Sequence, residues 1–147
     1  MADRCSATII IPTHLIPTAG ELLNPDEFDY VTTNPEGTTC FEASEVAWGT
    51  FDIEGELDEL GIPFDVEFGA SWDWTSGTRY YRPGKPPIEI NEGPQIELDE
   101  LNAIIGNNTH NDAALGQAFR DFVSAHVAAI PQPLSDFIPA ESIAKGA

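Results

Sequence analysis

The feature that most restricts the fold is the strict alternation of apolar and acidic residues over residues 64–68, which read Phe-Asp-Val-Glu-Phe. Successive side chains of a β-strand point to opposite faces, so this pattern predicts a strand with one buried face and one face that carries Asp65 and Glu67. Residues 73–77 have the composition of a turn, and residues 78–83, Thr-Arg-Tyr-Tyr-Arg-Pro, read as a return strand. The segment therefore predicts a β-hairpin within an antiparallel sheet.

Four more segments have the composition of strands. Residues 6–11 are short and rich in β-branched side chains, and Pro12 ends them. Residues 86–90 and 94–98 are short edge-type segments on either side of a turn. Residues 38–48 are a further strand candidate, although the glutamate, alanine and serine in their middle leave a helix as the alternative.

Three helices are predicted from apolar residues at helical spacing. The first follows Thr50, a possible N-cap, and Gly61 is placed to end it. The second begins near Asp99 as a possible cap and ends at Gly106. The third, within residues 109–130, has the clearest apolar stripe in the chain and is stopped by a proline.

The order of these elements predicts an α+β fold, with a small antiparallel sheet of about four or five strands and two or three helices packed on one face. At 147 residues the chain fits a single acidic domain, residues 1–147. Residues 12–37 contain four prolines and are expected to form a long irregular excursion with one short helix near residues 20–23. Residues 131–147 are expected to form a partly packed C-terminal tail.

The net charge is −19, from 25 acidic and 6 basic residues. Such a charge repels phosphates, so direct binding to nucleic acid or to a membrane is not expected, whereas a basic protein partner or divalent cations suit it. The chain has no recognisable secretory signal and no apolar run that approaches the roughly 20 residues needed to span a bilayer. Cys5 and Cys40 are too few for a disulfide scaffold. We therefore expect free buried thiols and a cytoplasmic location.

The sequence carries no recognisable catalytic or cofactor motif. It has no Gly-x-Ser-x-Gly elbow, no phosphate-binding glycine loop and no His-Glu-x-x-His motif. Residues 52–61 are rich in acids but lack the spacing of a calcium loop. We therefore expect a non-enzymatic protein with no cofactor and no metal, and an enzyme with a metal–carboxylate site is kept as a third possibility.

Residues 76–85 contain half of the basic residues of the chain, together with two adjacent tyrosines. In the structural interpretation, Arg79 and Arg82 neutralise Asp65 and Glu67 on the partner strand, and exposed pairs of this kind contribute about 0–1 kcal/mol. In the functional interpretation, the stretch is a binding hot spot, because tryptophan, tyrosine and arginine are enriched there.

Acidic residues are concentrated between Glu42 and Asp73, where ten acids and no base occur. Carboxylates two residues apart on a strand lie about 6.6–6.8 Å from each other on one face. Their charge density is comparable with that of phosphates, which repeat about every 3.4 Å along one nucleic-acid strand. Such a face suits a basic nucleic-acid channel, and the alternative is acidity that serves only solubility. The partner-binding residues that we predict are Glu42, Glu45, Asp52, Glu54, Asp58, Glu59, Asp65 and Glu67, with Trp72, Trp74 and Tyr80 as aromatic anchors.

Residues 41–84 combine an acidic, aromatic strand, a short Glu/Leu helix, the sequence Gly-Ile-Pro-Phe-Asp and a strand that ends near Tyr-Tyr-Arg-Pro-Gly. This segment, less than a third of the chain, resembles a pattern of small, mostly uncharacterised proteins of phages and plasmids. The resemblance implies a mobile-element origin. Small acidic proteins from that setting include anti-restriction and anti-CRISPR inhibitors, many of which act by nucleic-acid mimicry. The shared motifs are structural, so the resemblance transfers no functional residue.

The leading hypothesis is a non-enzymatic phage or mobile-element inhibitor. It would bind a basic, nucleic-acid-binding host defence protein or nucleoprotein complex, of CRISPR or restriction type, through an acidic surface that mimics nucleic acid. The alternative is a structural or accessory protein of a virion or plasmid that is acidic only for solubility.

Overall fold

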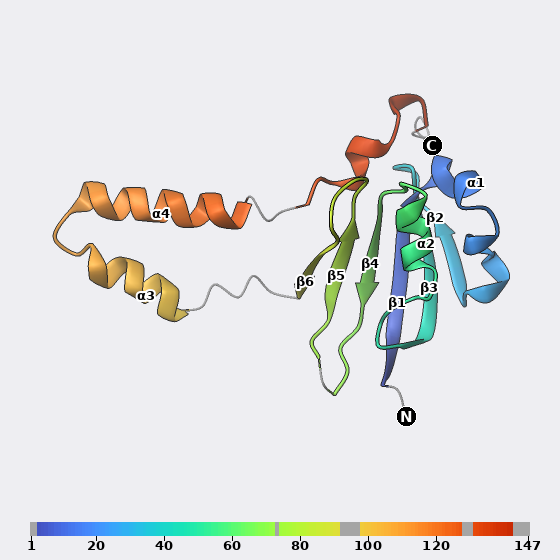
Figure 1. The fold of residues 1–147 in the computed structure, drawn as a ribbon, viewed down its shortest axis with the longest axis horizontal. Coiled ribbons are helices and arrows are strands. Elements are labelled where there is room, and N and C mark those ends of the chain that lie inside the picture. Colours follow the sequence, from blue (N-terminus) through green and yellow to red (C-terminus); the bar gives the residue numbers. More distant parts are fainter. Residues whose placement is uncertain (1–2, 73, 92–97, 128–130, 143–147) are drawn as a thin grey trace. The chain divides into compact units, whose positions relative to one another are not determined.

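The computed structural model describes residues 3–72, 74–91, 98–127 and 131–142 (Figure 1). Its contacts divide the chain into two units, one of residues 1–92 and 132–147 and one of residues 93–131. The first unit holds a β-sheet with its covering helices, and the second holds two helices.

The first unit is built on one six-stranded antiparallel sheet with the strand order β2-β3-β1-β4-β5-β6. The strands are β1 (Arg4–Pro12), β2 (Tyr30–Thr33), β3 (Thr38–Ala47), β4 (Phe64–Phe68), β5 (Gly77–Tyr81) and β6 (Ile88–Asn91). The predicted α+β class is confirmed, with six strands where four or five were expected. Strand β2 was not predicted, because it lies within the proline-containing segment 12–37.

The predicted hairpin is confirmed, since β4 and β5 pair antiparallel with Val66 opposite Arg79. Residues 38–47 form strand β3, so the helical alternative for residues 38–48 is wrong. Strand β3 pairs with β1 on one side and with β2 on the other. The predicted edge strand at residues 86–90 corresponds to β6. The second predicted edge strand lies outside the described residues, apart from its last residue, which begins a helix.

One face of the sheet carries the core, and we call it the helical face. Ile9, Ile11, Phe41, Phe64 and Val66 point to this face and are almost completely buried. They are covered by α1 (Ile16–Ala19), α2 (Glu54–Glu59) and short 3-10 helices over Thr13–Leu15, Gly20–Leu23 and Pro25–Glu27 (Figure 1). Full burial of one such side chain contributes about 1.5–3 kcal/mol, so the alternation of the strands fixes which face is covered. The opposite side of the sheet is called the outer face.

Helix α2 ends as the sequence predicts. Gly61 has a φ of 71° and donates its N–H to the carbonyl of Asp58 at 2.9 Å, while Ile62 donates to the carbonyl of Leu57 at 3.3 Å. These two bonds form a Schellman motif, and the accompanying apolar contact joins two buried residues, Leu57 and Ile62.

The start of α2 differs from the prediction that Thr50 is its N-cap. The helix begins only at Glu54, and the Thr50 hydroxyl donates to the carbonyl of Trp48 at 3.4 Å. The Glu54 carboxylate instead accepts the N–H of Phe51 at 2.6 Å. A side chain inside the helix therefore reaches back to satisfy the backbone of the preceding loop.

The second unit consists of α3 (Leu98–Asn107) and α4 (Asp112–Val127), which confirms two predicted helices. Asp99 lies in the first turn of α3 and is not its cap. Asn111 precedes α4, and its side-chain oxygen accepts the N–H of Ala114 at 3.0 Å. In the first unit, residues 134–142 add 3-10 helices over Leu134–Phe137 and Ala140–Ser142, and Leu134 is buried.

Candidate binding surface

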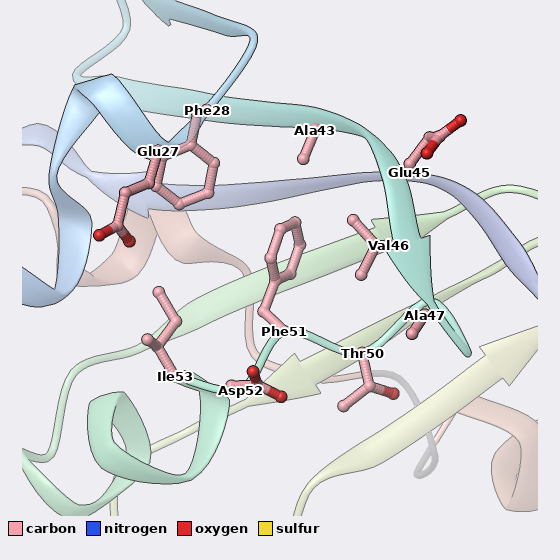
Figure 2. Close-up of a pocket in the computed structure, with 10 residues that line it drawn as sticks. All are labelled: Glu27, Phe28, Ala43, Glu45, Val46, Ala47, Thr50, Phe51, Asp52 and Ile53. Carbon is pink, nitrogen blue, oxygen red and sulfur yellow. The ribbon is translucent and has the colours of Figure 1, made fainter. Parts of the chain in front are cut away.

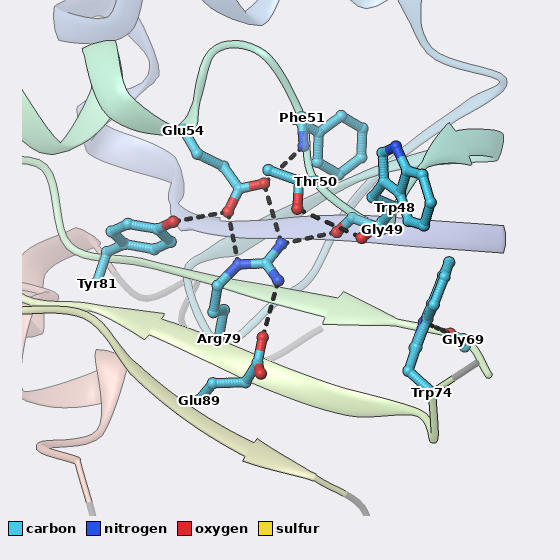
Figure 3. A network of polar contacts seen from close by, with 10 residues as sticks. All are labelled: Trp48, Gly49, Thr50, Phe51, Glu54, Gly69, Trp74, Arg79, Tyr81 and Glu89. Carbon is cyan, nitrogen blue, oxygen red and sulfur yellow. Dashed lines mark hydrogen bonds and ion pairs between the residues drawn. The ribbon is translucent and has the colours of Figure 1, made fainter. Parts of the chain in front are cut away.

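Arg79 is the centre of a polar network on the helical face (Figure 3). Its guanidinium donates to both oxygens of Glu54, from Nε to Oε1 at 2.8 Å and from Nη2 to Oε2 at 3.1 Å. It also donates to the carbonyl of Gly49 at 2.7 Å and to Oε1 of Glu89 at 3.0 Å. The Tyr81 hydroxyl donates to Glu54 at 2.8 Å. The network therefore ties α2 and the loop before it to β5 and β6.

The Glu54 carboxylate is almost completely buried, with a residue exposure of 2 %. Burial, together with the hydrogen bond and the charge of Glu54, raises the pKa of Tyr81 to about 12. Burial by itself lowers the pKa of Arg79, but the hydrogen bonds and charge of Glu54 and the hydrogen bond to Glu89 together outweigh that effect and leave this pKa above its ordinary value. Both oxygens of Glu54 are thus engaged in contacts within the protein. The carboxylate is not available to a partner, so Glu54 is not part of the candidate binding surface.

Arg82 is a second buried cation, with an exposure of 5 %. Its Nη1 lies 2.7 Å from Oδ1 of Asp65. The guanidinium also donates to three backbone carbonyls, those of Tyr81 at 2.8 Å, Phe64 at 3.2 Å and Gln132 at 2.6 Å. Burial raises the pKa of Asp65, and the charge of Arg82 opposes that shift. The Asp65 charge is therefore matched inside the protein.

The sequence predicted that Arg79 and Arg82 neutralise Asp65 and Glu67 on the partner strand. Arg82 does pair with Asp65, whereas Arg79 pairs with Glu54 and Glu89 and with neither of those two acids. The strand register gives the reason, because Arg79 lies opposite Val66 and shares its buried face. Glu67 is the next residue on β4 and therefore points to the outer face.

The remaining charge of the described chain is mostly acidic and lies at the surface. Apart from Glu54, every acidic residue whose burial is described is exposed or partly exposed. The exposed bases in the same part of the chain are Arg4, Lys85 and Arg120, and the ion pair of Arg4 with Glu45 is loose, at 3.9 Å. The surface therefore keeps nearly the whole net charge of the protein.

The outer face of the sheet brings together four of the predicted residues. Glu42 and Glu67 are both exposed and lie opposite Thr8 of β1, on its two sides. They are thus two strand spacings apart, or about 9.4–9.8 Å. Asp65 and Tyr80 lie opposite each other in the neighbouring row, and Tyr80 is partly exposed. With Asp65 paired internally, Glu42, Glu67 and Tyr80 remain for contact with a partner.

The two cysteines are free, as expected, but only Cys5 is fully buried. Cys40 lies in the same row of the outer face as Asp65 and is partly buried. Burial raises the pKa of its thiol, and the charges of Glu67 and Glu42 raise it further. A thiol in such surroundings stays protonated and is a poor nucleophile.

A tight turn follows β3. Trp48 and Gly49 both have positive φ values, 57° and 62°, and Thr50 donates its N–H to the carbonyl of Ala47 at 3.2 Å. Positive φ at both central residues is typical of a type I′ turn. A Cβ atom at position 49 would lie 3.0 Å from Cβ of Phe68, and the positive φ strains any side chain, so the site favours glycine. The left-handed conformation of Trp48 is unusual for a bulky residue.

Trp48 and Trp74 lie together at this turn, and all three tryptophans are partly or fully exposed. Trp48 is 57 % exposed, and its ring lies 5.9 Å from that of Trp74 (Figure 3). Trp74 packs against the edge of the core and donates its ring N–H to the carbonyl of Gly69 at 3.1 Å, while Trp72 is 96 % exposed. The sequence prediction included Trp72 and Trp74 and missed Trp48. The pair Trp48-Gly49, where the predicted strand 38–48 ends, was the available signal.

The other predicted acids lie away from the outer-face row of Glu42 and Glu67. Glu45 is near the end of β3, Asp52 is in the loop before α2, and Asp58 and Glu59 are on α2 itself. All are exposed except Asp58, which is partly buried. The structure therefore divides the predicted surface, with one part on the outer face and the other on elements that cover or border the helical face.

Among the residues that the structure describes, no group of three or more histidine, cysteine, aspartate or glutamate side chains is arranged to hold a metal ion. In the same residues, no helix combines the length and the apolar character needed to cross a membrane.

Comparison of the chain with protein-family models, with curated proteins and with solved structures finds no match. The functional interpretation therefore depends on the residues and the geometry of this chain.

Proposed function

We propose that the protein is a non-enzymatic inhibitor of phage or other mobile-element origin. It binds a basic, nucleic-acid-binding protein or nucleoprotein complex of host defence, of CRISPR or restriction type, in the host cytoplasm. Its acidic surface takes the place of the nucleic acid on that partner.

The observation that carries the proposal is the internal pairing of two arginines, one buried and one partly buried. Arg79 is held by Glu54, and Arg82 is held by Asp65. Because the charges of these two arginines are neutralised by internal ion pairs, the exposed carboxylates have almost no neighbouring positive charge. A net charge of this size works against compactness by self-repulsion and at the same time steers basic partners to the protein.

The outer face supplies both kinds of contact that such binding needs. Glu42 and Glu67 present charges that attract a basic surface over a distance. Tyr80 lies in the adjacent row and is partly exposed, and tyrosine is one of the residues enriched where truncation weakens binding most. We therefore assign the primary contact to the outer face around Glu42, Glu67 and Tyr80.

Affinity capture from a host lysate tests the proposal. Three tagged proteins are compared at low and high salt: the unmodified chain, the charge reversal E42K/E67K, and the matched reversal E21K/E56K at exposed acids away from the outer face. We expect the unmodified chain and E21K/E56K to recover a nucleic-acid-binding defence protein, with recovery falling as salt screens the charges. E42K/E67K should not recover it.

Two results would contradict the proposal. One is recovery of the same proteins by all three variants, and the other is recovery that does not change with salt. Capture of virion or plasmid structural proteins by all three would favour the accessory role, in which the acidity serves only solubility.

A further inference from the structure

A groove of about 290 Å³ lies beside the helical face, between the end of β3 and the loop that leads into α2 (Figure 2). Phe28 and Phe51 line it, with ring centres 5.8 Å apart, together with Ala43, Val46 and Ile53. These apolar residues also pack against the core, which holds the lining in place. The volume is at the lower end of the roughly 300–1,000 Å³ of ligand pockets, so it suits a few side chains and not a large ligand.

Acidic residues surround this apolar lining. Glu27 and Glu45 lie at opposite ends of the groove, and Asp52 lies beside Ile53 (Figure 2). All three are exposed, and no basic residue lines the groove. Glu45 has only its loose contact with Arg4, while Glu27 and Asp52 have no ion-pair partner among the described residues.

We propose that this groove binds a short basic amphipathic peptide segment. An apolar side chain of the segment, or the stem of a lysine or arginine, lies against Phe28 and Phe51. The cationic heads of its basic residues reach Glu27 and Asp52. This site is separate from the outer face, so it adds a second binding site to the proposed function and does not depend on it.

The chemistry of the groove selects this occupant. An anionic segment would be repelled by the three carboxylates, and a purely polar cation would gain nothing from the phenylalanine rings. Lysine and arginine side chains combine both requirements, because they lay an apolar stem on a hydrophobic surface and keep the charged head in water. A cation placed over an aromatic ring gains additional attraction.

The first test uses three blocked heptapeptides, with alternating Lys and Leu, alternating Lys and Ser, or alternating Glu and Leu. Binding is measured by titration calorimetry and by amide chemical shifts in ¹⁵N-labelled protein. We expect the Lys-Leu peptide to bind at least about tenfold more tightly than the Lys-Ser peptide, because only the first buries apolar surface. The Glu-Leu peptide should not bind, and the shifts caused by the Lys-Leu peptide should centre on residues 27–28, 43–47 and 50–53.

The second test uses two double variants with the same change in charge. E27Q/D52N removes two carboxylates at the groove, whereas E21Q/E56Q removes two exposed carboxylates elsewhere. We expect the first to weaken binding of the Lys-Leu peptide about three- to tenfold and the second less than about twofold. All four positions are exposed, so both proteins should keep the circular dichroism spectrum and the thermal midpoint of the parent.

Several outcomes would overturn the inference. They are no binding of the Lys-Leu peptide, equal binding of the Lys-Ser peptide, equal effects of the two double variants, or shifts that centre on Glu42 and Glu67. A failed lysate capture would count against the proposed function but would leave these peptide results unchanged, so the two ideas can fail separately.

Discussion

The side chains of Glu54 and Arg79 form a two-bonded ion pair in which the carboxylate is 3 % exposed and the guanidinium 14 % exposed. The pair joins the first residue of α2 to the middle of β5, across 25 residues of sequence. It also removes one acid and one base from the surface, and so it helps to define which charges remain exposed.

Removal of the Glu54 carboxylate is expected to destabilise the fold strongly. In Glu54→Leu the charge of Arg79 remains buried without its main counter-charge, which costs about 3–5 kcal/mol. Urea unfolding measures the loss, and Glu59→Gln on the exposed side of α2 is the control, with a change within about 0.5 kcal/mol. The double variant E54L/R79M should lose less than E54L alone, because it leaves no unpaired charge. A loss below about 1 kcal/mol in E54L would show that the pair is not a stabilising element.

The hydroxyl of Tyr81 is expected to make stability depend on pH at the alkaline end. Its pKa is raised from 10.0 to about 12, so the folded state favours the neutral phenol. The resulting stability is fully present below about pH 10 and is lost as the pH rises through about 12. Tyr81→Phe should remove this dependence of stability on pH. It should also destabilise the fold at pH 8 by about 1.5–3 kcal/mol, because the hydrogen bond to Glu54 is lost. Absorbance titration of the phenolates should show a transition near pH 12 that is missing in Y81F. If the transition near pH 12 persists in Y81F, its attribution to Tyr81 is wrong.

Alanine substitutions at two glycines should have opposite effects. Gly49→Ala places a side chain at a φ of 62° and 3.0 Å from Cβ of Phe68, so we expect a loss of at least about 1–2 kcal/mol. Gly55 lies inside α2 with nothing within 4 Å of an added Cβ atom, so Gly55→Ala should stabilise by about 0.5–1 kcal/mol. Thermal unfolding of both variants tests the pair. The turn geometry at Gly49 would be incorrect if G49A were as stable as the parent.

Arg82 and Asp65 should differ in their importance. Arg82→Met leaves the Asp65 charge and three backbone carbonyls without their donor, and should cost about 3–5 kcal/mol. Asp65→Asn leaves the guanidinium bonded to those carbonyls and should cost less. Because burial raises the pKa of Asp65 above 3.8, its contribution to stability is largest at low pH and falls as the pH rises through the folded-state pKa. In urea unfolding, D65N should therefore lack this change of stability with pH. A loss of stability in D65N equal to or greater than that in R82M would contradict the expected order.

Local pattern was sufficient for much of the fold. The two-residue period of β4 and the glycine at the end of α2 act within a few residues of sequence, so the hairpin and the helix end could be predicted. Strand β2 could not, because its four residues are all exposed and show no apolar alternation. Its place in the sheet depends on pairing with β3, which is a tertiary contact.

The candidate binding surface was harder to predict, because an acid-rich sequence does not show which acids face inward. Glu54 and Leu57 are three residues apart on α2 and therefore share a face, which was a local sign that Glu54 is buried. The pairing of Arg79 with Glu54 and not with Glu67 depends on the register of β4 and β5. Only the assembled sheet separates the acids of the outer face from those beside the groove.

The proposed function is tested most directly by competition between the protein and duplex DNA for the partner recovered from the host. Fluorescence anisotropy of a labelled duplex bound to the purified partner gives the fraction displaced. We predict that the unmodified chain and E21K/E56K displace the duplex at low salt, that displacement weakens as salt rises, and that E42K/E67K does not displace it. Displacement by E42K/E67K equal to that by the unmodified chain, or a stable complex that holds partner, protein and duplex together, would contradict the account.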